Sequence, residues 1–170
     1  MTAELEIDIA VNHDDWLKEA KDLNTLIAQT ISKAFEMSQI QFNSDIIGEV
    51  SVVLADDRFV QGLNLEYREK DKPTNVLSFP QTETSALQDM SGIVPFGDII
   101  IAYETVKNEA DEQNKSFIDH FTHLLVHGTL HLLGYDHQIE NEAEQMESLE
   151  IEILKQMGIE NPYSDINFMA

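Results

Sequence analysis

Residues 120–137 read HFTHLLVHGTLHLLGYDH and hold five of the six histidines in the chain. The stretch is apolar almost all round, which predicts a helix that is buried on most of its sides. Ser116 precedes it and Asp119 follows three residues later, a pattern typical of a capping box at a helix start. Gly134 is expected to end the helix, because glycine adopts the left-handed backbone conformation without a steric penalty. The fold is therefore expected to form around a buried central helix that carries histidines.

The histidine spacing in this stretch is H-x3-H-x5-H, formed by His127, His131 and His137. Residues four apart on a helix share a face and lie roughly 6 Å apart along the axis. His127 and His131 can therefore reach one ion, and a chain that leaves the helix at Gly134 can fold His137 back to join them. Three protein ligands and one open position are typical of a catalytic zinc site. The spacing predicts a metal site at these three histidines.

The composition indicates a globular protein, with 170 residues of which 42% are hydrophobic. This length predicts a single domain, 1–170, with a proper hydrophobic core. The chain has no cysteine, so it has no disulfide partner and no thiolate ligand for a metal. The first ten residues, MTAELEIDIA, lack the basic and apolar regions of a signal peptide, and no apolar run reaches the length of a membrane span. A cytoplasmic protein with no membrane partner is the simplest expectation.

The charge is strongly acidic, with 32 Asp and Glu against 10 Lys and Arg, for a net charge of −22. Such a balance argues against broad electrostatic docking on nucleic acid. The cations are unevenly distributed, since four of the ten lie within fifteen positions: Arg58, Arg68, Lys70 and Lys72. These four residues predict either a local basic patch or a solvated turn.

Alternating strand-like and helix-like patterns fill the rest of the chain and predict an α+β fold. A mixed sheet of about four strands, covered by helices, is expected from residues 4–10, 49–55, 75–79 and about 98–103. Helices are expected at 14–34, at 105–113, after 137, and from an Asp56 N-cap to Arg68. Residues 81–96 predict a mobile loop that is either a lid or a surface excursion. The last helix has an acidic face that is expected to be solvated: Glu140, Glu142, Glu144, Glu147 and Glu150.

The histidine spacing is also the ligand skeleton of the metzincin peptidases, glycine included. Those enzymes place a glutamate directly after the first histidine as general base. Gly128 occupies that position here, and general acid–base catalysis contributes about 10²–10⁴-fold in rate. The residues therefore favour a metal-dependent hydrolase other than a conventional peptidase. Asp136 is the nearest carboxylate in sequence and is expected either to orient a histidine or water, or to cap the turn.

The stretch HLLVHGTLHLLGYDH, from His123 to His137, resembles the signature of the YbeY family of endoribonucleases. It matches the family pattern H-G-x-L-H-L-x-G-Y-D-H without a departure. The resemblance extends to YREKDKPTNVLSFP (67–80), GDIII (97–101) and EAEQMESLEIEIL (142–154). Asn75 departs from the family pattern, in which many members have aspartate at this position.

The resemblance implies a single-strand-specific metallo-endoribonuclease that acts in 16S rRNA 3′-end maturation and ribosome quality control. It implies one Zn²⁺ per chain, or Ni²⁺ or another divalent metal, bound by His127, His131 and His137. The functional arginine of the family falls on Arg68, which suits the chemistry because guanidinium binds phosphate bidentately. Lys70 and Lys72 are expected to help more weakly. The implied partners are single-stranded rRNA and the ribosome or a small-subunit ribosomal protein.

The other histidines are expected to lie outside the metal set. His123 is one turn before His127 and is interpreted as a packed or hydrogen-bonded residue beside the ligands, while His120 and His13 are interpreted as structural or exposed. Two other functions are kept beside the endoribonuclease. One is a metal-dependent hydrolase of another substrate such as a peptide, and the other is a non-catalytic ribosome assembly factor with a structural metal.

Overall fold

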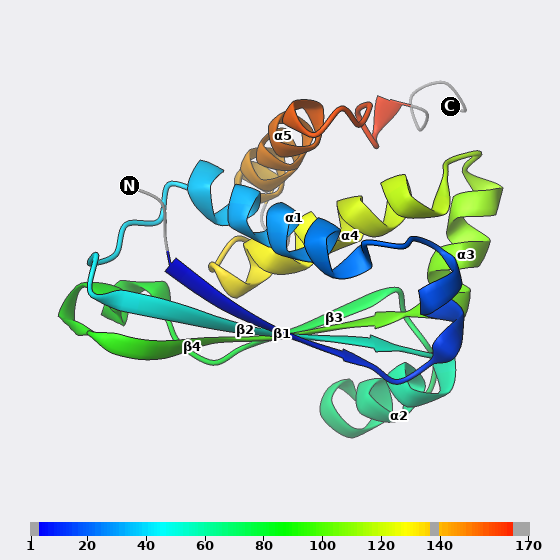
Figure 1. Cartoon of the computed structure of the whole chain (residues 1–170), viewed down its shortest axis with the longest axis horizontal. Helices are drawn as coiled ribbons and strands as arrows, with labels where there is room; N and C mark the ends of the chain where they lie inside the picture. Colours follow the sequence, from blue (N-terminus) through cyan, green and yellow to red (C-terminus); the bar gives the residue numbers. More distant parts are fainter. Residues whose placement is uncertain (1–3, 137–139, 165–170) are drawn as a thin grey trace.

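The computed structural model describes residues 4–136 and 140–164. Four strands form one sheet in the order β1-β2-β4-β3, in which β1, β2 and β4 run parallel and β3 runs antiparallel to β4. Figure 1 shows α1, α4 and α5 above the sheet and α2 alone below it. The predicted α+β fold with a mixed four-stranded sheet is therefore confirmed.

The elements follow one another along the chain with short connections. The strands are β1 (Glu4–Val11), β2 (Ile46–Ala55), β3 (Val76–Pro80) and β4 (Gly92–Ala102). The α-helices are α1 (Leu23–Met37), α2 (Asp57–Arg68), α3 (Tyr103–Glu112), α4 (Phe117–Leu132) and α5 (Glu140–Gln156). Two short 3₁₀ helices are η1 (Asp14–Lys18) and η2 (Thr84–Asp89). Among the described residues, no helix is both long and apolar enough to cross a membrane.

The histidine helix α4 lies at the centre of the molecule, as predicted. The Ser116 hydroxyl accepts a hydrogen bond from the Asp119 backbone N–H at 3.1 Å, so the predicted N-cap is confirmed. One face of α4 packs on the sheet through Phe121, Leu125 and Leu132, which are all buried in the main core. Burial of each such side chain contributes roughly 1.5–3 kcal/mol, so the position of the histidines is set by the core beneath them.

The long helix expected at residues 14–34 is wrong, because the chain breaks into η1 and α1. Trp16 is fully buried, and its indole N–H donates to the Ala55 carbonyl at the end of β2 over 2.9 Å. A buried indole N–H needs such a partner. This bond holds η1 against the end of the sheet, and α1 starts separately after Asp22.

The mobile loop expected at 81–96 is also wrong over much of its length. Leu87 in η2 is fully buried, and β4 already pairs with β2 from Gly92 onward. Pro95 makes this strand hard to recognise in the sequence, because proline within sheets is confined to edges and bulges and therefore argues against a central strand. It lies beside a register shift in which Glu49 pairs with Pro95 and Val50 pairs with Gly97.

Gly97 allows β3 and β4 to approach closely. Its φ is +142°, and a Cβ there would lie 2.2 Å from the Phe79 carbonyl oxygen. We therefore expect Gly97→Ala to lower the free energy of unfolding by roughly 2–4 kcal/mol, since strain and a backbone clash act together. Denaturant unfolding measures this loss. The control is Gly62→Ala on α2, where a Cβ meets nothing within 4 Å and helix propensity predicts a gain of about 0.5–1 kcal/mol. Equal stability in the two variants would contradict the expectation.

Candidate metal and phosphate site

The C-terminal end of α4 positions the predicted metal ligands. Gly134 has a φ of +94°, its N–H donates to the His131 carbonyl, and the Tyr135 N–H donates to the Leu130 carbonyl, both over 3.0 Å. These two bonds form a Schellman motif. The prediction that Gly134 ends the helix is confirmed. His137 lies outside the described residues.

His127 and His131 bring two imidazole nitrogens together, as their spacing predicts. Their Nε2 atoms lie 3.1 Å apart, and the ring centroids lie 4.6 Å apart. Two nitrogen ligands on one tetrahedral zinc ion are about 3.3–3.4 Å apart when each bond is about 2.0–2.1 Å long. The two donors therefore fit a shared divalent cation. Within residues 4–136 and 140–164, no group of three or more potential ligands is gathered for a metal. Of the three predicted ligands, His127 and His131 belong to these residues and His137 does not.

Glu150 of α5 contacts two histidines of α4, His123 and His127. Its side chain is fully buried, and its Oε1 lies 2.7 Å from His123 Nε2 and 3.4 Å from His127 Nδ1. The Tyr163 hydroxyl donates to the same carboxylate over 3.0 Å. Burial alone would raise the pKa of Glu150, but the hydrogen bonds and charges of His123 and His127 lower it to about 2. The carboxylate is therefore ionised at neutral pH.

An ionised carboxylate accepts hydrogen bonds but cannot donate them. The proton on His127 therefore belongs on Nδ1, and Nε2 keeps the lone pair that a metal requires. A carboxylate that orients a histidine in this way is a recurrent feature of metal sites. The same argument places a proton on His123 Nε2, so His123 is a hydrogen-bonded neighbour of the ligands, as interpreted from the sequence.

The solvated position expected for Glu150 is wrong. Buried Met146, Ile153 and Leu154 lie four residues before it and three and four residues after it, so Glu150 belongs to the apolar face of α5. Helical spacing could have revealed this, because a carboxylate within an apolar stripe points into the core. The general density of acids on α5 concealed that signal.

Arg68 is hydrogen-bonded to β3, the strand that also contacts the histidine helix α4. It is the last residue of α2, and its Nη2 donates to the Ser78 carbonyl over 3.2 Å. The Ser78 hydroxyl in turn donates over 3.1 Å to the carbonyl of Gly128, the residue after His127. A single residue of β3 therefore links the arginine to the histidine helix. Lys70 and Lys72 lie exposed in the turn that follows Arg68.

Gly128 lies where α4 approaches the sheet closely. A Cβ at this position would lie 3.1 Å from both Ile99 Cγ2 and Ser78 Oγ. These contacts are tighter than ordinary van der Waals contact, so a larger side chain would require Ile99 or Ser78 to shift by a few tenths of an ångström. The position at which metzincins carry their glutamate base therefore faces the sheet here, which disfavours a conventional peptidase.

The other histidines lie apart from the predicted ligands. His120 is buried, and its Nε2 lies 2.8 Å from Glu109 Oε1. Asn75, which departs from the family pattern, donates to the same Glu109 oxygen over 3.1 Å and so joins a partly buried polar network. His13 contacts Asp15 at the start of η1. The structural interpretation of His120 and His13 agrees with these contacts.

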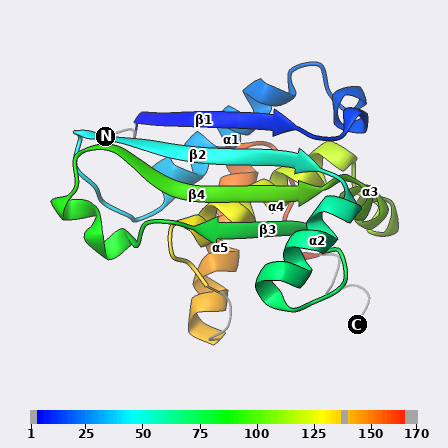
Figure 2. The same cartoon turned by 90° about the horizontal axis from the view of Figure 1, so that it is seen from below.

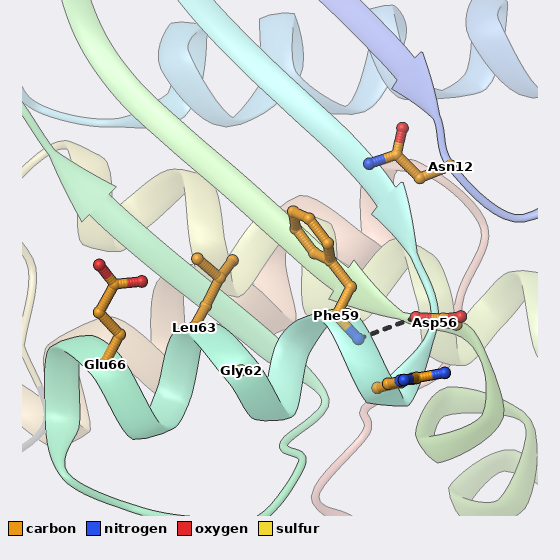
Figure 3. Close-up of a pocket in the computed structure, with 7 residues that line it drawn as sticks. Asn12, Asp56, Phe59, Gly62, Leu63 and Glu66 are labelled. Atoms are coloured by element: carbon orange, nitrogen blue, oxygen red, sulfur yellow. Dashed lines mark hydrogen bonds between the residues drawn. The ribbon is translucent and has the colours of Figure 1, made fainter.

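A separate hollow of about 540 Å³ lies on the opposite face of the sheet, against α2. Figure 3 shows Phe59, Leu63 and Glu66 on the side of α2 that is turned toward the strands, with Asn12 across from them. Asp56 lies at its end, where the predicted N-cap is confirmed by the 2.9 Å bond from the Phe59 N–H. None of Arg68, His127 and His131 lines this hollow, so the candidate site is elsewhere.

The fold and the site define an α+β protein with a histidine pair on a buried helix and an arginine linked to that helix through β3. Comparison with known proteins identifies the family. A family model described as Endoribonuclease YbeY matches residues 9–158. The chain belongs to the endoribonuclease YbeY family, and the resemblance found in its sequence is confirmed.

Individual relatives agree with this assignment. An endoribonuclease YbeY from Sinorhizobium fredii (strain NBRC 101917 / NGR234) is 46% identical over 97% of this chain and 95% of its own length. One from Paramagnetospirillum magneticum (strain ATCC 700264 / AMB-1) is 41% identical over 97% and 99%. A solution structure of a Thermotoga maritima protein has a TM-score of 0.52 at 24% identity, covering 89% of this chain and 91% of the other. At that identity the structural likeness shows a shared fold alone.

Proposed function

We propose that this protein is a zinc-dependent endoribonuclease that hydrolyses phosphodiester bonds in single-stranded rRNA. Its family membership supports ribonuclease chemistry. The observation that carries the metal assignment is the 3.1 Å approach of His127 Nε2 and His131 Nε2, with Glu150 behind His127. The link from Arg68 through Ser78 to Gly128 supports a phosphate subsite beside that metal.

His127, His131 and His137 would hold the cation. A divalent cation bound there would stabilise charge on a phosphoryl oxygen and would activate water for hydrolysis. Three imidazoles also suit Ni²⁺ or another divalent metal, because imidazole nitrogen accepts several first-row ions. Glu150 keeps His127 in the tautomer that can bind metal, and it keeps the imidazole ring in one orientation.

Arg68 would bind the phosphate. Its guanidinium is cationic and carries five N–H donors. One of these donors contacts the Ser78 carbonyl. The Ser78 bond fixes the direction of the planar group, and the remaining donors match two phosphate oxygens. Such preorganised donors stabilise charge that develops in the transition state. Lys70 and Lys72 would add positive potential in the adjoining turn.

The cellular role proposed for this activity is 16S rRNA 3′-end maturation and ribosome quality control in the cytoplasm. The net charge of −22 makes unaided capture of free RNA unfavourable, because like charges repel over roughly 8–10 Å at physiological salt. The rRNA would instead be presented by the ribosome, through a small-subunit ribosomal protein. A salt-sensitive, tight complex with naked rRNA would contradict this mode of delivery.

The proposed reaction is tested with matched single-stranded and double-stranded rRNA fragments and with a peptide library. Zinc-loaded enzyme is expected to cleave the single strand alone. Cleavage of peptides, with RNA left intact, would support a different metal-dependent hydrolase. Zinc binding without any cleavage would support the assembly-factor alternative.

Glu150→Gln is expected to weaken zinc binding roughly 10- to 100-fold, because a neutral amide fixes the His127 tautomer less well than a carboxylate does. Competition with a chromogenic chelator measures this affinity in the intact protein. Glu144→Gln is the matched control, since Glu144 is exposed on the same helix. An unchanged zinc affinity in a folded Glu150→Gln protein would show that the contact does not act on the metal site.

A further inference from the structure

Two aromatic side chains adjoin Arg68 and have no part in the site described so far. Tyr67 precedes Arg68 at the end of α2, and 62% of it is exposed. Its ring centroid lies 5.4 Å from that of Phe79 on β3, with the ring planes 62° apart. The Arg68 guanidinium carbon lies 5.6 Å from the centroid of the Phe79 ring. Phe79 therefore contacts a cation and a second, largely exposed aromatic ring.

The alternation of β3 explains how this aromatic pair comes close to the histidine helix. Successive strand side chains point to opposite faces of a sheet. Ser78 faces α4 and bonds to Gly128, whereas Phe79 packs on the α2 side with Leu77 and Val60. Figure 2 shows β3 at the edge of the sheet, with α2 on the near face. Arg68 bonds to the backbone between these two side chains, so it lies where the two faces meet.

An exposed aromatic ring next to an arginine is suited to an unpaired base. Single-stranded nucleic acid binds where a cation holds the backbone and an aromatic ring stacks on a base. Most other exposed apolar side chains among the described residues are aliphatic, such as Leu17 and Leu65 at 63% and 49%, and aliphatic side chains offer no π-face. Phe59 is also aromatic and 43% exposed, but it lines the hollow against α2 and, among the described residues, has no second ring beside it as Tyr67 has in Phe79.

Charge favours the same place. Arg68, Lys70 and Lys72 lie within five positions in a chain whose net charge is −22. Glu66, Glu69 and Asp71 alternate with them, so this turn is close to neutral while most of the surface is acidic. A polyanion therefore meets less repulsion at this edge of the sheet than elsewhere.

We propose that Tyr67 and Phe79 form a stacking subsite for one unpaired base, next to the phosphate that Arg68 binds. The inference rests on the proposed endoribonuclease activity and adds a base-binding position to it. The RNA would cross the β3 edge, with its base on the α2 side and its scissile phosphate on the α4 side. A base held in a duplex cannot reach the aromatic pair without leaving its stack, so the subsite selects single strands.

The test combines a protein change with a substrate change. Steady-state cleavage of a short single-stranded RNA is measured with zinc-loaded wild type, Tyr67→Ala, Tyr67→Phe and Leu65→Ala. The same RNA is then used with one abasic nucleotide placed at each position in turn. Stacking on an aromatic side chain contributes about 1–3 kcal/mol per base, so Tyr67→Ala is expected to raise KM roughly 5- to 150-fold with a much smaller change in kcat.

Tyr67→Phe keeps the ring and is expected to recover most of this loss, while Leu65→Ala is expected to behave as wild type. With wild-type enzyme, one abasic position should raise KM by a similar factor, and that position should have little further effect in Tyr67→Ala. An unchanged KM in Tyr67→Ala, or equal losses at every abasic position, would overturn the subsite alone. Wild-type enzyme that cleaves no RNA would overturn the proposed function and the subsite together.

Discussion

His131→Ala is expected to abolish zinc binding and to lower RNA cleavage by at least about 10³-fold, since metal activation of water and phosphate is lost together. His131 is half-buried near the C-terminal end of α4, and its Nε2 is 3.1 Å from His127 Nε2. Its removal leaves His127 and the predicted ligand His137, one fewer than the three protein ligands of a catalytic zinc site. Metal content and single-stranded RNA cleavage are measured on the same preparation.

The matched control for this variant is His13→Ala. His13 is the one histidine outside residues 120–137, and it contacts Asp15 near η1. This variant is expected to keep both its zinc and its activity. Both variants must be purified in the same way as the wild type, because traces of a contaminating ribonuclease would mimic activity. A His131→Ala protein that still binds one zinc per chain would contradict the ligand assignment.

Arg68→Ala is expected to lower kcat/KM for RNA by roughly 10²–10³-fold, the usual effect of removing one preorganised donor of transition-state charge stabilisation. The zinc content should not change, because the described contacts link Arg68 to α4 through Ser78 and not through His127 or His131. Arg68→Lys keeps the charge but loses the planar fork, so it should restore only part of the rate. Steady-state kinetics on one RNA fragment measures all three proteins.

Arg58→Ala is the matched control, because Arg58 is on the same helix but lines the hollow on the outer face of the sheet. Its removal should leave kcat/KM nearly unchanged. If Arg58→Ala and Arg68→Ala lose activity equally, the cations of α2 act through general attraction for RNA and not through one phosphate subsite. Unaltered cleavage by Arg68→Ala would remove Arg68 from the site.

Local signals in the sequence predicted the helix ends well. Asp56, Ser116 and Gly134 each act through one or two bonds to nearby backbone, and all three perform the expected role. The four-stranded mixed sheet was also predictable, because its central strands contain the apolar runs 52–55 and 99–102 and strand patterns alternate with helical patterns along the chain. The approach of the His127 and His131 nitrogens was predictable from their spacing, because both residues lie on one regular helix.

Features that depend on contacts distant in the sequence were not predictable. The break after η1 depends on Trp16 reaching Ala55, and the early start of β4 depends on its pairing with β2 across a bulge at Pro95. The burial of Glu150 is a different case, because local helical spacing could have revealed it, and the density of acids on α5 concealed that signal. The aromatic pair forms only when the end of α2 folds against β3, and sequence distance gives no sign of that contact.

Under the proposed mechanism, the α4 histidines hold the cation that RNA hydrolysis requires. Zinc content and cleavage of single-stranded rRNA are followed in one wild-type preparation before chelation, after chelation and after zinc is restored. We expect zinc and activity to be lost together and to return together, and we expect identically purified His131→Ala to recover neither. Cleavage that continues at the original rate in zinc-free enzyme would contradict this mechanism.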